Sequence, residues 1–277
     1  METKSAMGNV AKASRNAILQ DALDILEADD GKSFEEKRDA VIKQLTKKDY
    51  TELDKILVEK AIADKAGAET KAAFWKYGKV IPVGGEIVLR IVEPEDRDGY
   101  LYLQKKYSTL RAMLKEESYC DMVWREHTED KSLMLSIAKG TEYIGYCGIK
   151  DTSLDLWEIA IEMKPEWTHQ GIGYAALSAM LKAMKDRTGV TRYRIRIDPS
   201  NYVSQRLFEK LGATPFGLSE LWIHDPNVLE KCEEDNLHLI DNQLIEVAEK
   251  FNVEPRKLLS HILEYRMVWH GDEAKNG

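Results

Sequence analysis

The feature that most constrains the fold of this chain is a glycine turn between a strand-like run and a long amphipathic segment. The run at 157–163 is strand-like, and the residues after Gly171 and Gly173 place their apolar side chains on one face of a helix that stops at Gly189. A second strand-like run at 193–197 follows, with a second helical pattern behind it. The predicted unit is therefore βαβα, in which the two strands are parallel and the crossover is right-handed.

The turn itself has the properties of a phosphate-binding site. Glycines at 171 and 173 let a ligand approach the backbone closely. The N–H groups that open the following helix have no intrahelical partners and carry the positive end of its dipole. A diphosphate fits such a place, although many helices begin after glycines, so an ordinary helix start is the alternative.

Two longer motifs enclose this turn. The first is apolar-x-apolar-x-Pro at 161–165 with Gly-x-Gly at 171–173, and the second is Asn-x-x-Ser with Glu-Lys-x-Gly at 201–212. Together they resemble the GNAT superfamily of N-acetyltransferases, and the second motif is closest to the RimJ/RimL-like branch that acetylates ribosomal-protein N-termini. Two residues depart from the family pattern: Thr168 stands where Arg or Gln is usual, and Phe208 stands where many members have a tyrosine that acts as the general acid.

The resemblance implies an α/β (α+β) fold with a mixed central sheet whose two parallel strands splay apart. It assigns residues 86–270 to the GNAT domain, with two early helical segments beside the acceptor groove. We expect residues 1–82 to form a separate N-terminal helical region and residues of about 226–260 to form a helical insertion before the last strand, at 263–269.

The N-terminal region carries start signals for two or three short helices. Capping-box spacing occurs at 33–36 and again at 49–52. An aromatic cluster at 74–77 ends the region and is expected to pack on the domain that follows, with the boundary at 82–85. The region serves either as a structural extension or homodimer contact, or as a partner-binding module.

Other strands are indicated by runs rich in β-forming residues. We expect strands at 87–92 and 221–223, and a hairpin made of 133–138 and 143–149. Within the insertion, the pattern at 244–255 superficially resembles a helix-turn-helix opening. An αα-hairpin has the same spacing, and acidic residues dominate, so DNA binding is not the favoured interpretation.

Composition excludes several classes of protein. The 40 basic and 48 acidic residues give a net charge of −8, which argues against sequence-independent nucleic-acid binding and fits an amine-bearing partner, with solubility as the plain alternative. Cys120, Cys147 and Cys232 are widely spaced and no histidine has metal-ligand spacing, so we expect free thiols and no metal site. Because the sequence has no signal-peptide pattern and no membrane-length apolar run, we expect a cytoplasmic protein that does not enter a membrane.

The resemblance implies acetyl-CoA as the co-substrate and gives each of its binding residues. Backbone groups of Ile161 and Met163 would bind the pantetheine arm and polarise the thioester carbonyl. Asn201 would contact the arm, although asparagine is also a favoured N-cap. The diphosphate would lie on the turn, at Gln170, Gly171, Ile172, Gly173 and Tyr174.

The two candidate catalytic residues are Glu158 and Ser204. The resemblance makes Glu158 the base that takes the amine proton and Ser204 the hydroxyl beside the thioester sulfur. A second interpretation is open for Glu158, because Glu158 and Glu162 lie on a strand beside the alternating arginines of 192–196. Cross-strand ion pairs there would keep the carboxylate ionised and make it a poor base.

The function that follows is an N-acetyltransferase that moves an acetyl group from acetyl-CoA to a primary amine, either a protein N-terminus or a small amine. An aminoglycoside or polyamine acceptor is one alternative. A catalytically inactive GNAT-fold protein with a binding or regulatory role is another, and the departures at Thr168 and Phe208 would fit it.

Overall fold

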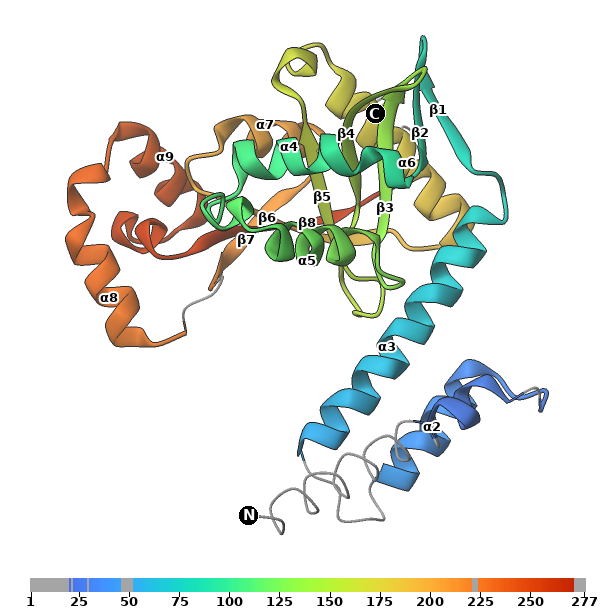
Figure 1. The fold of residues 1–277 in the computed structure, drawn as a ribbon. Coiled ribbons are helices and arrows are strands. Elements are labelled where there is room, and N and C mark those ends of the chain that lie inside the picture. Colours follow the sequence, from blue (N-terminus) through green and yellow to red (C-terminus); the bar gives the residue numbers. More distant parts are fainter. Residues whose placement is uncertain (1–19, 21, 29, 46–51, 221–223, 272–277) are drawn as a thin grey trace.

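An eight-stranded mixed sheet forms the centre of the protein (Figure 1). The computed structural model describes residues 20, 22–28, 30–45, 52–220 and 224–271. The strands are β1 (Val80–Gly84), β2 (Ile87–Ile91), β3 (Leu133–Lys139), β4 (Glu142–Ile149), β5 (Trp157–Met163), β6 (Arg192–Ile197), β7 (Thr214–Ser219) and β8 (Ile262–Val268). Their spatial order is β1-β2-β3-β4-β5-β6-β8-β7, and β5 with β6 is the parallel pair in it. The mixed sheet expected from the sequence is confirmed.

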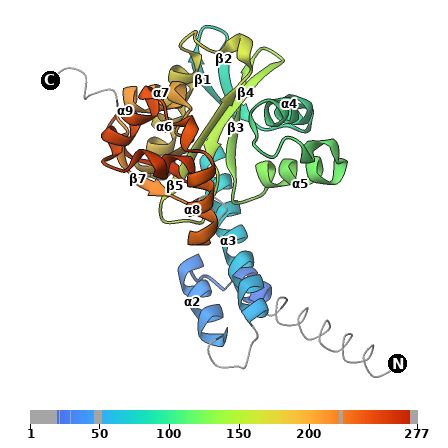
Figure 2. The ribbon, with the colours of Figure 1, turned by 90° about the vertical axis from the view of Figure 1, so that its left-hand side faces the viewer.

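Helices cover both faces of this sheet. Figure 2 shows α4 (Arg97–Tyr107) and α5 (Glu117–Thr128) on one side and α6 (Ile172–Thr188) on the other. The further α-helices are α2 (Phe34–Leu45), α3 (Glu52–Trp75), α7 (Tyr202–Lys210), α8 (Pro226–Asp235) and α9 (Asn242–Phe251). Short 3-10 helices lie at Pro94–Asp96, Met113–Lys115, Pro165–Trp167, Leu237–Leu239 and Pro255–Leu259. Across the described ranges, no helix has the length and apolar character that a membrane span needs.

Alternation along β5 divides its side chains between two cores. Trp157, Ile159 and Met163 are buried together with the apolar face of α6. Ala160 packs against a second apolar cluster, to which α4 and α5 contribute. Because successive side chains of a strand point to opposite faces of the sheet, the even-numbered Glu158 and Glu162 lie on the side of α4 and α5.

β5 and β6 begin as partners and then separate. Within these two fully described strands, the register pairs are Trp157 with Tyr193 and Glu158 with Arg194. β5 continues through 159–163 with no further register pair to β6, whereas β6 stays paired with β8 along its whole length. The splayed parallel strands expected from the sequence are therefore present, and one edge of β5 borders a gap.

The N-terminal region differs from the expected set of short helices. Residues 22–27, α2 and α3 are helical, and side chains from all three meet in a small apolar cluster. The difference lies in α3, which is a helix of 24 residues and not a short one. The first predicted capping box forms, since the Ser33 N–H donates to the Glu36 carboxylate at 2.8 Å. The second falls partly outside the described residues, because Asp49 is not among them.

The boundary expected at 82–85 falls inside the sheet. β1 pairs with β2 in antiparallel register, so these residues belong to the β1–β2 hairpin. Phe74, near the end of α3, is fully buried in the main core, and Arg187 of α6 lies over its ring at 4.8 Å and donates to its carbonyl at 3.2 Å. The aromatic cluster thus packs on the following domain as expected, except for Tyr77, which is exposed.

The sheet contains an edge strand, β7, that the sequence did not predict. Residues 221–223 are outside the described part of the chain, and the observed strand is β7 at the edge of the sheet. β7 contains Pro215 and an irregular register between Pro215 and Gly217. Proline and bulges are typical of edge strands and remove the regular alternation by which a strand is recognised in a sequence.

The expected helical insertion fills the connection between β7 and β8. It consists of α8 and α9 with two 3-10 helices, and it lies at one end of the sheet (Figure 1). α9 is followed by the 3-10 helix Pro255–Leu259 and then by β8, not by a second α-helix. The pattern at 244–255 therefore does not form a helix-turn-helix.

A buried carboxylate holds the insertion together. Glu233 of α8 is fully buried and accepts hydrogen bonds from Arg256 at 2.8 Å, Lys257 at 2.9 Å and Ser260 at 2.8 Å. Burial raises the pKa of Glu233, but the bonds to Lys257, Ser260 and Arg256 outweigh it, and the pKa lies below its usual value. The ionised carboxylate therefore joins α8 to the segment that leads into β8.

We predict that Glu233→Gln lowers the free energy of unfolding by about 1–3 kcal/mol at pH 7, because charged hydrogen bonds to a buried group are lost. The pKa of Glu233 is depressed in the folded state, so its contribution is present at neutral pH and is lost as the pH falls through the folded-state pKa. Urea titrations at pH 7 and pH 4 measure both effects. Glu230→Gln, on the exposed face of the same helix, is the control, and equal losses in the two variants would contradict the prediction.

Candidate active site

The start of α6 leaves backbone amides open, as the predicted phosphate site requires. Gly171 is the N-cap with a φ of 79°, a left-handed value that favours glycine, and no side chain of the described residues caps the helix. The first N–H groups of any helix lack carbonyl partners within it, and here the first two belong to Ile172 and Gly173. These groups carry the positive end of a helix of 17 residues, so the turn can hold an anion.

Gly173 brings this turn close to the elements around it. A Cβ atom at this position would lie 3.3 Å from Met163 Sδ, 3.6 Å from Ile161 Cδ1 and 3.7 Å from Leu207 Cδ2. α6 therefore begins directly against β5 and α7. A branched side chain at this position would occupy the space next to the open amides.

The backbone groups of Ile161 and Met163 face the gap between β5 and β6. The Glu158 carbonyl accepts from the Lys150 N–H just after β4, and the Lys164 N–H donates to the Ile144 carbonyl of β4. Because the bonding direction alternates along a strand, the odd-numbered Ile161 and Met163 turn theirs to the opposite edge. One of these groups has a partner, since the Tyr107 hydroxyl of α4 donates to the Met163 carbonyl at 3.1 Å. The structure thus brings both predicted backbone positions to the gap.

Asn201 and Ser204 lie at the start of α7, directly after β6. The Asn201 side chain accepts from the Ser204 N–H at 3.1 Å, so this asparagine is an N-cap. Ser204 is half-buried. Because β5 and β6 are parallel, α6 and α7 both begin at the same edge of the sheet, where ligands of α/β proteins usually bind.

The other residues predicted for the diphosphate lie at the rim of the turn. Gln170 is exposed, and its side chain donates to the Glu166 carbonyl at 2.7 Å. Tyr174 is half-buried, and Lys210 Nζ of α7 lies 4.7 Å from the centre of its ring. Lys210 adds a positive charge beside the start of α6, a contribution that the sequence motif alone did not indicate.

The two departures from the family pattern have local explanations. The Thr168 hydroxyl donates to the Pro165 carbonyl at 2.7 Å and so closes the turn that follows β5. Phe208 of α7 is buried and belongs to the main core cluster, which also contains residues of α6 and β8. Phe208 therefore supplies no proton donor, which leaves Ser204 as the predicted hydroxyl.

Glu158 lies at the point where β5 and β6 separate, and three cations surround it. Its carboxylate bonds Lys150 Nζ at 2.6 Å, Arg196 Nε at 2.8 Å and Arg194 Nη2 at 3.1 Å, and 4% of its side chain is exposed. Burial raises the pKa of Glu158, but Lys150 and Arg196 outweigh it, and the pKa lies below its usual value. Of the two interpretations of Glu158, the cross-strand ion pair is the one present, and it argues against a role as base.

Glu162, two residues further along β5, has a different environment. Among the described residues it has no ion-pair partner; it accepts from Gln104 Nε2 of α4 at 2.9 Å and from the Tyr146 hydroxyl. Burial raises the pKa of Glu162 to about 7, opposed by Tyr146 and Lys150. The sequence placed Glu162 on the strand beside the same arginines as Glu158 and gave it no role of its own. The structure separates the two carboxylates, because the register pairs of β5 with β6 end before residue 162.

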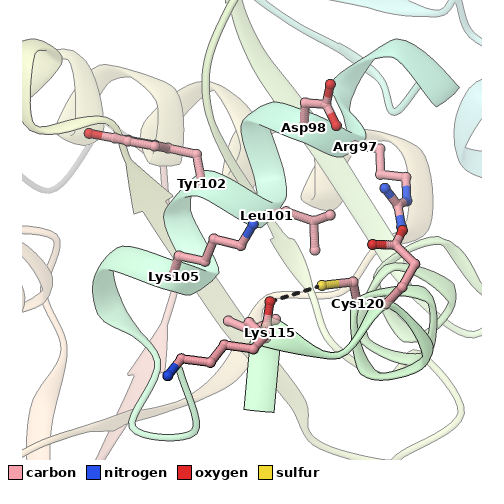
Figure 3. A pocket seen from close by; sticks show the side chains of 9 residues that line it. Arg97, Asp98, Leu101, Tyr102, Lys105, Lys115 and Cys120 are labelled. Carbon is pink, nitrogen blue, oxygen red and sulfur yellow. Dashed lines mark hydrogen bonds and ion pairs between the residues drawn. The ribbon is translucent and has the colours of Figure 1, made fainter. Parts of the chain in front are cut away.

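A pocket of about 690 Å³ lies between α4 and α5 (Figure 3). Arg97 on its wall pairs with Glu117, and the buried Cys120 donates its thiol to the Leu114 carbonyl at 3.4 Å. Lys105 extends across it from α4. None of the predicted site residues lines this pocket. In the part of the chain that the structure describes, no three His, Cys, Asp or Glu side chains are grouped as metal ligands.

Comparison with protein families identifies the domain. Residues 86–214 match the family model described as an acetyltransferase (GNAT) domain. This part of the chain is a GNAT acetyltransferase domain. The acyl donor of this superfamily is acetyl-CoA, and the residues around the start of α6 fit its diphosphate. A search of curated proteins found no match to the chain.

The solved structures that resemble this chain are distant in sequence, and their TM-scores lie below 0.5. RimL, described as a ribosomal L7/L12 alpha-N-protein acetyltransferase in complex with coenzyme A, is 13% identical, with 70% of this chain and 99% of that chain covered and a TM-score of 0.49. The microcin C7 self-immunity acetyltransferase MccE, in complex with acetyl-CoA and AMP, is 17% identical, with coverages of 67% and 94% and a TM-score of 0.45. A chimeric spermidine N-acetyltransferase SpeG from Vibrio cholerae is 11% identical, with coverages of 66% and 96% and a TM-score of 0.46.

We predict that Gly173→Val weakens acetyl-CoA binding by at least about tenfold, the equivalent of ~1.4 kcal/mol. The physical reason is that its side chain would fill the space between the α6 amides and Met163. Isothermal titration calorimetry measures the Kd. The control is Gly189→Asn at the other end of α6, where φ is 75° and asparagine is tolerated. An unchanged Kd in a folded Gly173→Val protein would show that the ligand does not lie on these amides.

Proposed function

We propose that this protein is an acetyl-CoA-dependent N-acetyltransferase whose acceptor is a primary amine. The observation that carries the proposal is the uncapped start of α6 at the mouth of the gap between β5 and β6. The GNAT domain at 86–214 supports the same conclusion. A gap without open amides, or open amides without a gap, would not accommodate a nucleotide diphosphate together with an extended thioester arm.

Each predicted cofactor residue has a task in this proposal. Gly171, Ile172, Gly173 and Tyr174 bind the diphosphate through backbone N–H groups, with Gln170 at the rim. Ile161 and Met163 hold the extended arm at the edge of β5, and Asn201 fixes the first turn of α7 so that Ser204 lies beside the sulfur. Bound acetyl-CoA supplies an activated acetyl group as a thioester. Donors from the β5 backbone stabilise the charge that develops on its carbonyl oxygen.

The acceptor is proposed to be either a protein N-terminus or a small amine. The net charge of −8 favours an acceptor that is a cation in solution. Such an acceptor approaches from the side of α4 and α5, because α6 covers the other face of β5. We also propose a cytoplasmic location, which the three free cysteines support.

The test has two stages, and each can fail separately. Calorimetry with acetyl-CoA is expected to show binding at micromolar concentration, and a thiol-release assay against a panel of peptides and small amines is expected to show turnover with at least one of them. Binding without turnover for any amine would favour a non-catalytic GNAT-fold protein. An absence of binding at millimolar acetyl-CoA would remove the proposed function.

We predict that Ser204→Ala lowers kcat by about 10²-fold, the lower end of the usual contribution of a general acid. Acetyl-CoA affinity should change little, because the Asn201 cap bonds the backbone of residue 204 and not its hydroxyl. Steady-state kinetics with the best amine of the panel and calorimetry measure the two quantities. Ser200→Ala, in the turn before α7, is the control, and wild-type kcat in Ser204→Ala would exclude Ser204 from the mechanism.

A further inference from the structure

A carboxylate, an amide and a phenol meet on the face of β5 opposite α6. Glu162 projects from β5 toward α4, beyond the last residue pair that β5 forms with β6. Gln104 of α4 donates to it at 2.9 Å, and Tyr146, its register partner on β4, supplies a hydroxyl. The Glu162 side chain is half-buried, so it keeps some access to solvent.

The position of Glu162 in the strand relates it to the proposed thioester site. Its two neighbours, Ile161 and Met163, turn their backbone groups into the gap between β5 and β6. The Glu162 side chain lies on the adjoining face, where α4 and β4 enclose it. An amine that reaches the gap from the side of α4 therefore passes this carboxylate.

Resting on the proposed acetyl transfer, we propose that Glu162, and not Glu158, is the base that accepts the acceptor proton, with Gln104 and Tyr146 as positioning residues. The protonated amine gives one proton to the Glu162 carboxylate, which releases it to solvent. The neutral nitrogen forms a bond to the thioester carbon, and the C–S bond breaks. The nitrogen loses its second proton as the amide forms, and the departing thiolate receives one proton, so the step balances. Ser204 is the hydroxyl proposed above to give the thiolate its proton.

The surroundings of the two carboxylates explain this choice. Lys150, Arg194 and Arg196 bond Glu158 directly and hold it ionised, so it has little tendency to take a proton. Burial dominates at Glu162 and raises its pKa to about 7, so this carboxyl can both accept and release a proton near neutral pH. The titratable groups that face Glu162 are Tyr100 and Tyr107 of α4, Tyr143 and Tyr146 of β4, and Lys150 at the end of β4.

The decisive variant is Glu162→Gln, which keeps the size of the side chain and removes the base. We expect kcat/KM for the amine to fall by about 10²-fold or more at pH 7. In the wild type, kcat/KM should rise with pH through an apparent pKa of about 7. This rising part of the profile, the acidic limb, should be absent from the variant. A limb that belongs to the amine itself should remain in both enzymes.

A second variant tests the positioning role. Tyr146→Phe removes a hydroxyl that stabilises the ionised carboxylate. The Glu162 limb should therefore persist but move to higher pH, a shift that a loss of packing alone does not produce. Glu166→Gln, an exposed carboxyl just after β5, is the matched control and should leave the profile unchanged. Acetyl-CoA Kd and Tm, measured for every variant, should stay close to the wild-type values.

The outcomes separate the base from the underlying reaction. Wild-type kcat/KM and an unchanged acidic limb in Glu162→Gln would overturn the assignment of Glu162 while the acetyltransferase stands. A wild-type protein without acetyl-CoA binding, or without turnover of any amine, would overturn the proposed function and the base together. Loss of activity in Glu162→Gln with normal acetyl-CoA affinity and no acidic limb would support the assignment.

Discussion

The separation of β5 from β6 is the constraint on which the whole site depends. Their ladder stops after Glu158, where Lys150, Arg194 and Arg196 hold the carboxylate at the vertex. Beyond it, β5 has backbone groups along one edge that face no neighbouring strand. Backbone polar groups need partners, so these must be met by water, by side chains such as Tyr107, or by a ligand. In the proposed mechanism this ion cluster lies at the vertex of the opening and takes no part in the proton transfer.

The two faces of β5 then divide the work of the proposed enzyme. On one face, close packing of Gly173 against Met163 brings the α6 amides next to the gap, with Lys210 nearby. On the other, α4 and β4 surround Glu162 with phenols and an amide and leave it without a direct cation among the described residues. The positive end that suits a diphosphate and the basic carboxyl that suits an amine are therefore on opposite sides of one strand.

The elements added to the central domain are each fixed through a buried contact. α3 inserts Phe74 into the main core, where Arg187 bonds its carbonyl and covers its ring. The α8–α9 insertion depends on Glu233, whose carboxylate joins α8 to the segment before β8. The Phe74 anchor lies at Arg187, near the C-terminal end of α6 and away from its start.

The sequence by itself determined the βαβα unit, the glycine turn and the helical insertion, because these depend on local periodicity and on glycines at fixed spacing. The splayed pair was expected only from the resemblance to the GNAT superfamily. The sequence missed β1 and β7, whose prolines and glycines hide the alternation that marks a strand. It also singled out Glu158 and gave Glu162 no role, although both alternate beside the same arginines. Only the tertiary structure separated them, because the ion pairs of one and the burial of the other depend on where two strands part, and that is fixed by packing on both faces of the sheet.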